Sequence, residues 1–161
     1  MTDAQPSVFF SCAGPTLSRK IMTSTASYLL RPVGFVRSQF TAREGVPKQG
    51  SEGAPEAWAD IDPAFAEALD GIAPGQELVL VTWLHQGRRS VLRVHPRDDP
   101  KKPLKGVFAT RSPDRPNPIG LHRVRVLEIA ESVHLRVEPL EALDGTPVID
   151  IKPVLPGSID T

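Results

Sequence analysis

The feature that most constrains this chain is a stiff, polar stretch of fifteen residues, GVFATRSPDRPNPIG, at positions 106–120. It contains three prolines. Each proline fixes its own φ near about −65° and keeps the preceding residue out of the helical region. The stretch therefore predicts an extended, pre-ordered loop that would lose little conformational entropy on binding a ligand. It displays Arg111, Asp114, Arg115 and Asn117. A rigid connector between two strands is the alternative interpretation.

Basic residues are concentrated around this loop. The chain carries 19 Lys and Arg against 19 Asp and Glu, so its net charge does not indicate a nucleic-acid partner. Between Arg93 and Arg125, however, nine basic residues stand against three aspartates. This concentration predicts a surface that faces phosphate groups. The alternative is a solvated face whose charges pair with their neighbours.

The composition excludes several classes of protein. Cys12 is the only cysteine, so the chain forms no internal disulfide and no thiolate metal cluster. His95, His122 and His134 do not stand with carboxylates at metal-ligand spacing, and we expect no metal. No apolar run approaches the roughly 20 residues that span a membrane, so we expect no membrane contact and a cytoplasmic location. No G-x-G-x-x-G motif follows an expected strand, so no Rossmann nucleotide site is predicted.

The chain divides into a tail and one domain. Residues 1–27 are rich in Ser and Thr and lack sustained hydrophobic periodicity, which predicts a flexible N-terminal tail. A start of translation at Met22 is an alternative explanation of this segment. Residues 28–161 are expected to form a single domain, since they are numerous enough to bury a core of their own.

Within this domain the pattern favours strands over helices. Asp62 and Pro63 begin, and Gly71 ends, an expected short helix. Residues 39–60 are expected to form a long loop, because Gly and Pro recur through them. A break in alternation near Leu127 indicates a β-bulge. Apolar and β-branched runs predict strands at residues 33–38, 77–85, 91–95, 121–129, 133–138 and 148–151. The predicted fold class is therefore mainly β, a single small β-barrel with one or two short helices.

The proline-rich stretch resembles the signature segment of the TsaA/TrmO family, and other blocks resemble the same family in the same order. In the second of these blocks, Lys48 stands where the family usually has Arg. The chain ends soon after the last block and so resembles a short form of the family without a C-terminal domain. The blocks are PVGFVRS at 32–38, GVPKQ at 45–49, ALDG at 68–71, WLHQ at 83–86 and DGTPVIDIKP at 144–153.

The resemblance implies a β-barrel tRNA methyltransferase that depends on S-adenosylmethionine. The implied reaction transfers a methyl group to N6 of N6-threonylcarbamoyladenosine, next to the anticodon. It also implies a homodimer with the cofactor site near the partner subunit. Two alternatives stay open. One is a non-catalytic RNA-binding barrel, and the other is an S-adenosylmethionine-dependent methyltransferase that acts on another RNA or a small molecule.

By the same resemblance, cofactor binding is assigned to residues in several of these blocks. Arg111 is expected to grip the methionine carboxylate or a phosphate through its guanidinium fork, with a surface salt bridge as the alternative. Asp144 has an alternative role at the start of the Asp-Gly turn. The expected cofactor-binding residues are Lys48, Gln49, His85, Gln86, Arg111, Leu121, Glu141, Leu143 and Asp144.

Asn117 and His85 are the candidate catalytic residues. Asn117 stands between two prolines, so its side-chain carbonyl is expected to point in a fixed direction and to accept a hydrogen bond from an adenine N6–H. His85 is expected to orient the substrate or to carry a proton, the alternative being a histidine satisfied by local hydrogen bonds. The candidates for RNA phosphate contacts are Lys101, Lys102, Lys105, Arg115, Arg123 and Arg125.

Overall fold

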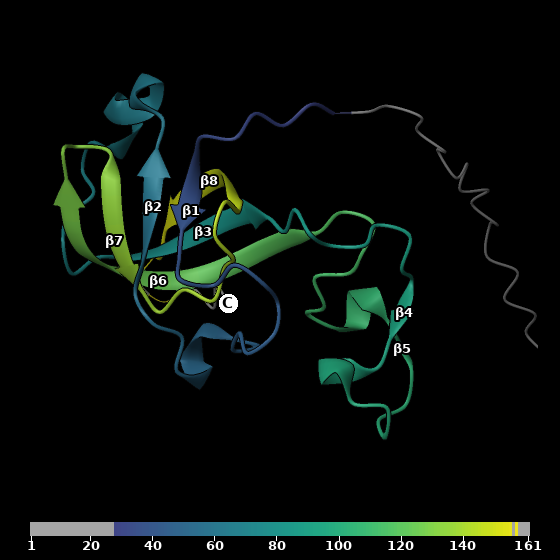
Figure 1. Cartoon of the computed structure of the whole chain (residues 1–161). Coiled ribbons are helices and arrows are strands. Elements are labelled where there is room, and N and C mark those ends of the chain that lie inside the picture. Colours follow the sequence, from purple (N-terminus) through teal and green to yellow (C-terminus); the bar gives the residue numbers. More distant parts are fainter. Residues whose placement is uncertain (1–27, 156, 158–161) are drawn as a thin grey trace, which may run out of the picture.

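A closed barrel of antiparallel strands forms the body of the protein, for which the computed structural model describes residues 28–155 and 157. Its strands follow one another in the order β1-β2-β7-β6-β3-β8 (Figure 1). The fold class predicted from the sequence is thereby confirmed. The barrel strands are β1 Gly34–Arg37, β2 Ala57–Ile61, β3 Glu77–Trp83, β6 Ile119–Ala130, β7 His134–Glu138 and β8 Pro147–Pro153.

Strand β8 closes the barrel because it pairs with β1 on one side and with β3 on the other. The interior is apolar, and Leu80, Leu135 and Val148 each have 0% of their surface exposed. The longest strand, β6, alternates between exposed and buried residues along most of its length. Alternate side chains of a strand point to opposite faces, so one face of β6 fills the barrel and the other faces outward.

Two local predictions are confirmed. The short helix is present as the 3-10 helix η2, Pro63–Leu69, and Asp62 caps it by accepting a hydrogen bond from the Ala64 amide at 2.9 Å. The pairing of β6 with β7 shifts register between Val126 and Glu128, which is the predicted bulge at Leu127. A bulge adds local twist to a strand, and strong twist helps a small barrel to close.

The prediction of an unbroken loop over residues 39–60 is wrong at its end, since β2 begins at Ala57. Alanine and aspartate have low strand propensity, so the sequence of β2 gives a weak signal. The barrel overrides that propensity: Ala57 and Ala59 are buried inside it. On the outer face, Asp60 accepts hydrogen bonds from Arg37 at 2.7 Å and pairs with His134 at 2.8 Å. These partners stand on the two neighbouring strands and fix the register of β2.

A small lobe projects from the barrel between β3 and β6 (Figure 1). Its two short strands, β4 Arg93–Val94 and β5 Lys105–Gly106, pair with each other and not with the barrel. The strand expected at 91–95 is therefore present but shorter. The lobe also holds two single-turn 3-10 helices, η3 Pro96–Asp98 and η4 Val107–Ala109. A third such turn, η1 Gly50–Glu52, lies in the loop between β1 and β2.

The N-terminal tail predicted over residues 1–27, and with it the alternative start at Met22, lies outside the described residues. The first barrel strand begins at Gly34. Over residues 28–155 and 157, no helix is both long enough and apolar enough to cross a membrane.

We expect Leu135→Ala to lower the free energy of unfolding by about 2–5 kcal/mol, because it leaves a cavity in a fully buried part of the barrel. Urea denaturation measures this change. Leu92→Ala is the matched control, since Leu92 is 65% exposed on the lobe. It should change the unfolding free energy by no more than about 0.5 kcal/mol. Equal effects of the two substitutions would contradict the assignment of the core.

Candidate functional site

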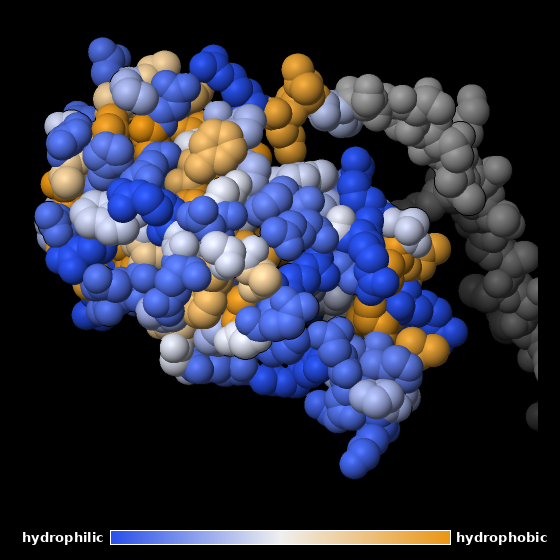
Figure 2. All heavy atoms as spheres, in the orientation of Figure 1, coloured by the Kyte–Doolittle hydropathy of each residue, from blue (hydrophilic) through white to orange (hydrophobic). Residues whose placement is uncertain are grey.

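A cleft of about 1220 Å³ lies between the barrel and the lobe. Its lining comes from the loop between β1 and β2, the turn after β3, the lobe, the strand β6, and the segment between β7 and β8. Segments far apart in the sequence therefore line one cleft. The face of the molecule drawn in Figure 2 carries mainly hydrophilic side chains, with apolar ones in smaller groups.

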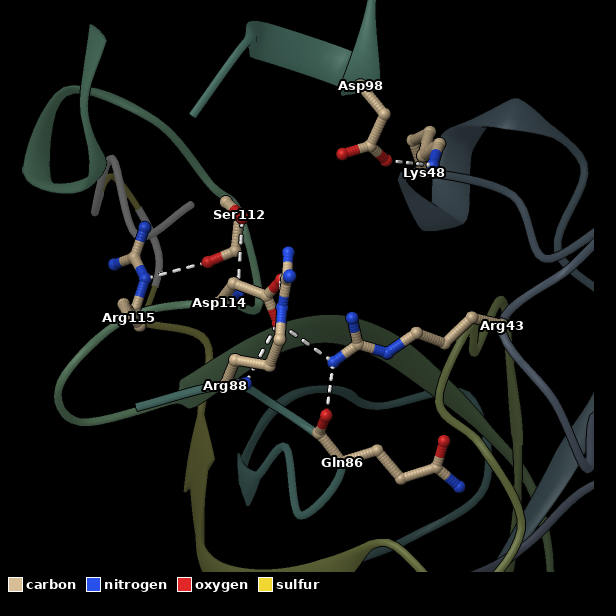
Figure 3. A network of polar contacts seen from close by, with 8 residues as sticks. All are labelled: Arg43, Lys48, Gln86, Arg88, Asp98, Ser112, Asp114 and Arg115. Carbon is tan, nitrogen blue, oxygen red and sulfur yellow. Dashed lines mark hydrogen bonds and ion pairs between the residues drawn. The ribbon is translucent and has the colours of Figure 1, made fainter. Parts of the chain in front are cut away.

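The carboxylate of Asp114 joins three of these segments. Its Oδ1 accepts hydrogen bonds from the Arg88 backbone amide at 2.9 Å and from Arg43 Nη2 at 3.0 Å. Its Oδ2 accepts from Arg88 Nε at 2.8 Å (Figure 3). Arg43 also donates to the carbonyl of Gln86. The loop after β1, the turn after β3 and the proline-rich loop are thus held by one side chain, of which only 7% is exposed.

The pKa of Asp114 lies below its ordinary value of 3.8. Burial alone raises this pKa, but the hydrogen bonds from Arg88 and Arg43 favour the ionised form and outweigh burial. The carboxylate therefore carries its charge at neutral pH and offsets part of the positive charge of the two guanidinium groups.

Arg115 binds its own loop from within. Its Nε donates to the Ser112 carbonyl at 2.8 Å, and its Nη2 donates to the carbonyls of Val107 at 2.9 Å and of Thr110. These bonds attach Arg115 to a turn that is already hydrogen-bonded, since the Val107 carbonyl also accepts from the Thr110 amide at 3.1 Å and from the Thr110 hydroxyl at 3.0 Å. They add a side-chain constraint to the stiffness that the prolines impose.

Two ion pairs connect the loop between β1 and β2 with the lobe. Lys48 Nζ lies 2.8 Å from Asp98 Oδ2 (Figure 3), and Arg97 Nη2 lies 2.7 Å from Glu52 Oε1. Both acidic and basic partners line the cleft or border it, so the pairs bridge its rim. Exposed pairs of this kind contribute no more than about 1 kcal/mol each.

The structure brings together most of the residues that the sequence assigns to the cofactor. Eight of the nine line the cleft, namely Lys48, Gln49, His85, Gln86, Arg111, Leu121, Glu141 and Leu143. Asp144 is not among the lining residues. Its Oδ1 accepts a hydrogen bond from the Ser38 amide at 3.0 Å, and its own amide donates to the Phe40 carbonyl at 2.7 Å. Contact of any of these residues with a ligand stays a prediction.

The two candidate catalytic residues occupy different positions. His85 is exposed and lines the cleft, and within the part of the chain described its ring has no hydrogen-bond partner. Asn117 is exposed but lies outside the lining residues. Its backbone carbonyl accepts a hydrogen bond from the Ile119 amide at 2.8 Å. The geometry therefore brings His85, and not Asn117, into the cleft.

The candidate RNA-binding residues fall into two groups. Lys105, Arg115, Arg123 and Arg125 line the cleft, whereas Lys101 and Lys102 stand on the lobe outside it. Arg123 Nη2 pairs with Glu77 Oε2 at 2.7 Å. No group of three or more His, Cys, Asp or Glu residues suited to a metal ion occurs within residues 28–155 and 157.

Sequence reasoning assigned no role to Arg43 or His122. Arg43 lies in a loop far from Asp114 in sequence, and no local signal joins the two. His122 lies on the inward face of β6 and is only 5% exposed. The sequence did hold a signal for His122, because it is a polar residue at an inward position of an alternating strand, and buried polar groups need partners. Its partners are Thr82 Oγ1 and Glu141 Oε1, each at 2.9 Å.

Comparison with known proteins gives one family. The family model described as the tRNA-methyltransferase O N-terminal domain matches residues 35–160. A probable S-adenosyl-L-methionine-binding protein of Methanothermobacter thermautotrophicus is 49% identical over 124 residues, which cover 77% of this chain and 88% of that protein. An S-adenosyl-L-methionine-binding protein of Archaeoglobus fulgidus is 40% identical over 128 residues, covering 80% of this chain and 90% of the relative.

Solved structures agree with this result. A crystal structure of TrmO from Pseudomonas aeruginosa superposes with a TM-score of 0.66 at 32% identity, over 86% of this chain. A further crystal structure of TrmO gives a TM-score of 0.66 at 34% identity, over 84% of this chain. The chain spans only 62% of the length of each of these two proteins.

We expect Asp114→Asn to lower the free energy of unfolding by about 1–3 kcal/mol at neutral pH, because it leaves two arginines without their buried carboxylate. Pairing lowers the folded-state pKa, so this stabilisation is present above the unfolded pKa and is lost as pH falls through the folded pKa. The difference between wild type and variant should be constant above about pH 5 and shrink below it. Urea denaturation at a series of pH values measures it.

Asp70→Asn is the control for this experiment. Asp70 is exposed, and its side chain forms no hydrogen bond or ion pair within the described residues. A loss of stability from Asp70→Asn equal to that from Asp114→Asn would contradict the role of the Asp114 network.

Proposed function

Because the chain belongs to the tRNA-methyltransferase O N-terminal domain family, we propose that it is an S-adenosylmethionine-dependent tRNA methyltransferase. The proposed reaction methylates N6 of N6-threonylcarbamoyladenosine next to the anticodon. The observation that carries the proposal is the cleft, which collects eight predicted cofactor residues from separate segments. The names of the archaeal relatives, which specify S-adenosyl-L-methionine binding, support the choice of cofactor.

The residues of the cleft fit this cofactor. S-adenosylmethionine carries a carboxylate, an ammonium group, ribose hydroxyls and a planar adenine. Arg111 is exposed in the cleft and offers a guanidinium fork to a carboxylate. Glu141 offers a carboxylate to an ammonium or hydroxyl group, and Leu121 and Leu143 offer apolar surface to the adenine.

When bound, S-adenosylmethionine supplies an electrophilic methyl group on its sulfonium sulfur. The protein then has to align an acceptor nitrogen with that methyl group and keep water out, which is chemistry of positioning. N6 loses a proton when it gains a methyl group. His85 is the proton acceptor in this proposal, because it lies in the cleft and has no hydrogen-bond partner among the described residues.

The polynucleotide partner in this proposal is tRNA. Lys105 and Arg125 lie beside the cleft and have no ion-pair partner among the described residues, so they are available for phosphate groups. The homodimer implied by the resemblance and a cytoplasmic location, where tRNA is found, complete the proposal. Size-exclusion chromatography with light scattering measures the oligomeric state.

Nucleoside mass spectrometry tests the reaction directly. Purified protein is incubated with methyl-labelled S-adenosylmethionine and tRNA that carries or lacks the threonylcarbamoyl group. We expect label only on N6-threonylcarbamoyladenosine. Label on another nucleoside or on a small molecule would assign a different substrate. Salt-dependent tRNA binding without cofactor binding would indicate a non-catalytic RNA-binding barrel.

The same assay tests Asn117. The role predicted from the sequence requires Asn117→Ala to lower kcat by about tenfold or more, since a lost hydrogen bond to the reacting group slows the chemical step. Full methylation by this variant at saturating substrate would exclude a catalytic role for Asn117.

We expect Arg111→Ala to raise the Kd for S-adenosylmethionine by about tenfold or more, because it removes a charge-assisted bond. Isothermal titration calorimetry measures this Kd. Arg31→Ala is the matched control, since Arg31 pairs with Asp62 at 3.7 Å and does not line the cleft. An unchanged Kd for Arg111→Ala would remove Arg111 from the cofactor site.

A further inference from the structure

A buried polar triad stands at the edge of the apolar barrel core, where the core meets the cleft. His122 on β6 is 5% exposed and Thr82 on β3 is 0% exposed. His122 Nε2 lies 2.9 Å from Thr82 Oγ1, and His122 Nδ1 lies 2.9 Å from Glu141 Oε1. An ionised carboxylate only accepts hydrogen bonds, so Nδ1 donates to Glu141 and the Thr82 hydroxyl satisfies Nε2.

The backbone is shaped around this triad. A Cβ at Gly120 would lie 2.5 Å from Thr82 Oγ1 and 2.8 Å from His122 Nε2. No real side chain tolerates such distances, so the triad requires glycine at this position. Gly120, the last residue of the proline-rich stretch 106–120, thus allows β3 and β6 to pack closely at this point. The ring of His122 is consequently held on both sides, with neither nitrogen free to exchange a proton with a ligand.

Glu141 differs from the other two members because its side chain is the most exposed of the three. Its side chain is 19% exposed and it lines the cleft, as does His122. Its Oε1 is fixed by His122, whereas Oε2 has no hydrogen-bond partner among the described residues. A Cβ at Gly50 would lie 3.2 Å from Oε2. Glycine at this position therefore leaves the approach to that oxygen open.

We propose that His122 is a positioning residue, which holds Glu141 so that Oε2 faces the cleft and accepts a hydrogen bond from a hydroxyl or ammonium group of the bound cofactor. This inference rests on the proposed function. A freely rotating carboxylate loses side-chain entropy each time it binds a donor. Fixing one oxygen inside the barrel removes most of that loss before the ligand arrives. His122 acts only through Glu141 and is no proton acceptor.

Two substitutions of His122 separate this role from a purely structural one. The amide nitrogen of Asn occupies the place of Nδ1, so His122→Asn keeps the donor to Glu141 and loses the bond to Thr82. The amide of Gln corresponds in position to Nε2, so His122→Gln keeps the bond to Thr82 and loses the donor to Glu141. Each variant loses one bond and some volume, so thermal denaturation should give similar melting temperatures for both.

Calorimetric titration with S-adenosylmethionine provides a readout other than activity. We expect His122→Gln to raise the Kd by about tenfold and His122→Asn to stay within about threefold of wild type. In methylation assays the change should appear in the KM for the cofactor, with kcat nearly unaltered. When Glu141→Gln is already present, His122→Gln should add little further loss, because the two residues act as one unit.

Equal Kd values for the Asn and Gln variants would overturn this inference, as would additive losses in the double variant. Neither result would affect the proposed function, since wild type would still bind the cofactor. Failure of wild type itself to bind S-adenosylmethionine would overturn both.

Discussion

The cleft depends on the ionised carboxylate of Asp114. Arg43 and Arg88 carry positive charge from two separate segments, and each would repel the other without a buried anion between them. The carboxylate is bonded through both oxygens, which fixes the direction of each guanidinium. Loops that carry binding residues are usually mobile, and here the network of charged hydrogen bonds around Asp114 holds them in fixed positions beside the barrel.

The barrel supplies the rigid frame on which that network is built. Closure through β8 leaves the barrel itself, as described, without a free sheet edge, and a packed apolar interior resists deformation. The end of β3 pairs with the start of β6, where Trp83 lies opposite Ile119. The connection between these strands, which contains the proline-rich loop, therefore begins and ends at the same end of the barrel. The lobe belongs to the same connection between β3 and β6 (Figure 1). Residues of the lobe form part of the cleft lining.

Structural features that a few adjacent residues specify were predicted from the sequence, whereas features that depend on distant residues were not. The cap at Asp62 and the bulge at Leu127 were predicted because each rests on a few adjacent residues. Strand β2 was missed because two of its three inward positions hold alanine, and its pairing with β1 and β7 makes it a strand. Arg43 was missed for a similar reason, since its value to the site comes from a partner 71 residues away.

The sequence by itself determined the fold class and the stiffness of the proline-rich loop, and it named eight candidate cofactor residues that line the cleft. These predictions follow from hydrophobic alternation, from proline geometry and from motifs of the family. Only the tertiary structure decided which polar groups meet. It directed Arg115 into its own loop, left Asn117 outside the cleft and joined His122 to Glu141. The physical reason is that hydrogen bonds and ion pairs depend on distance and direction in space, and barrel closure brings together residues whose spacing along the chain carries no such information.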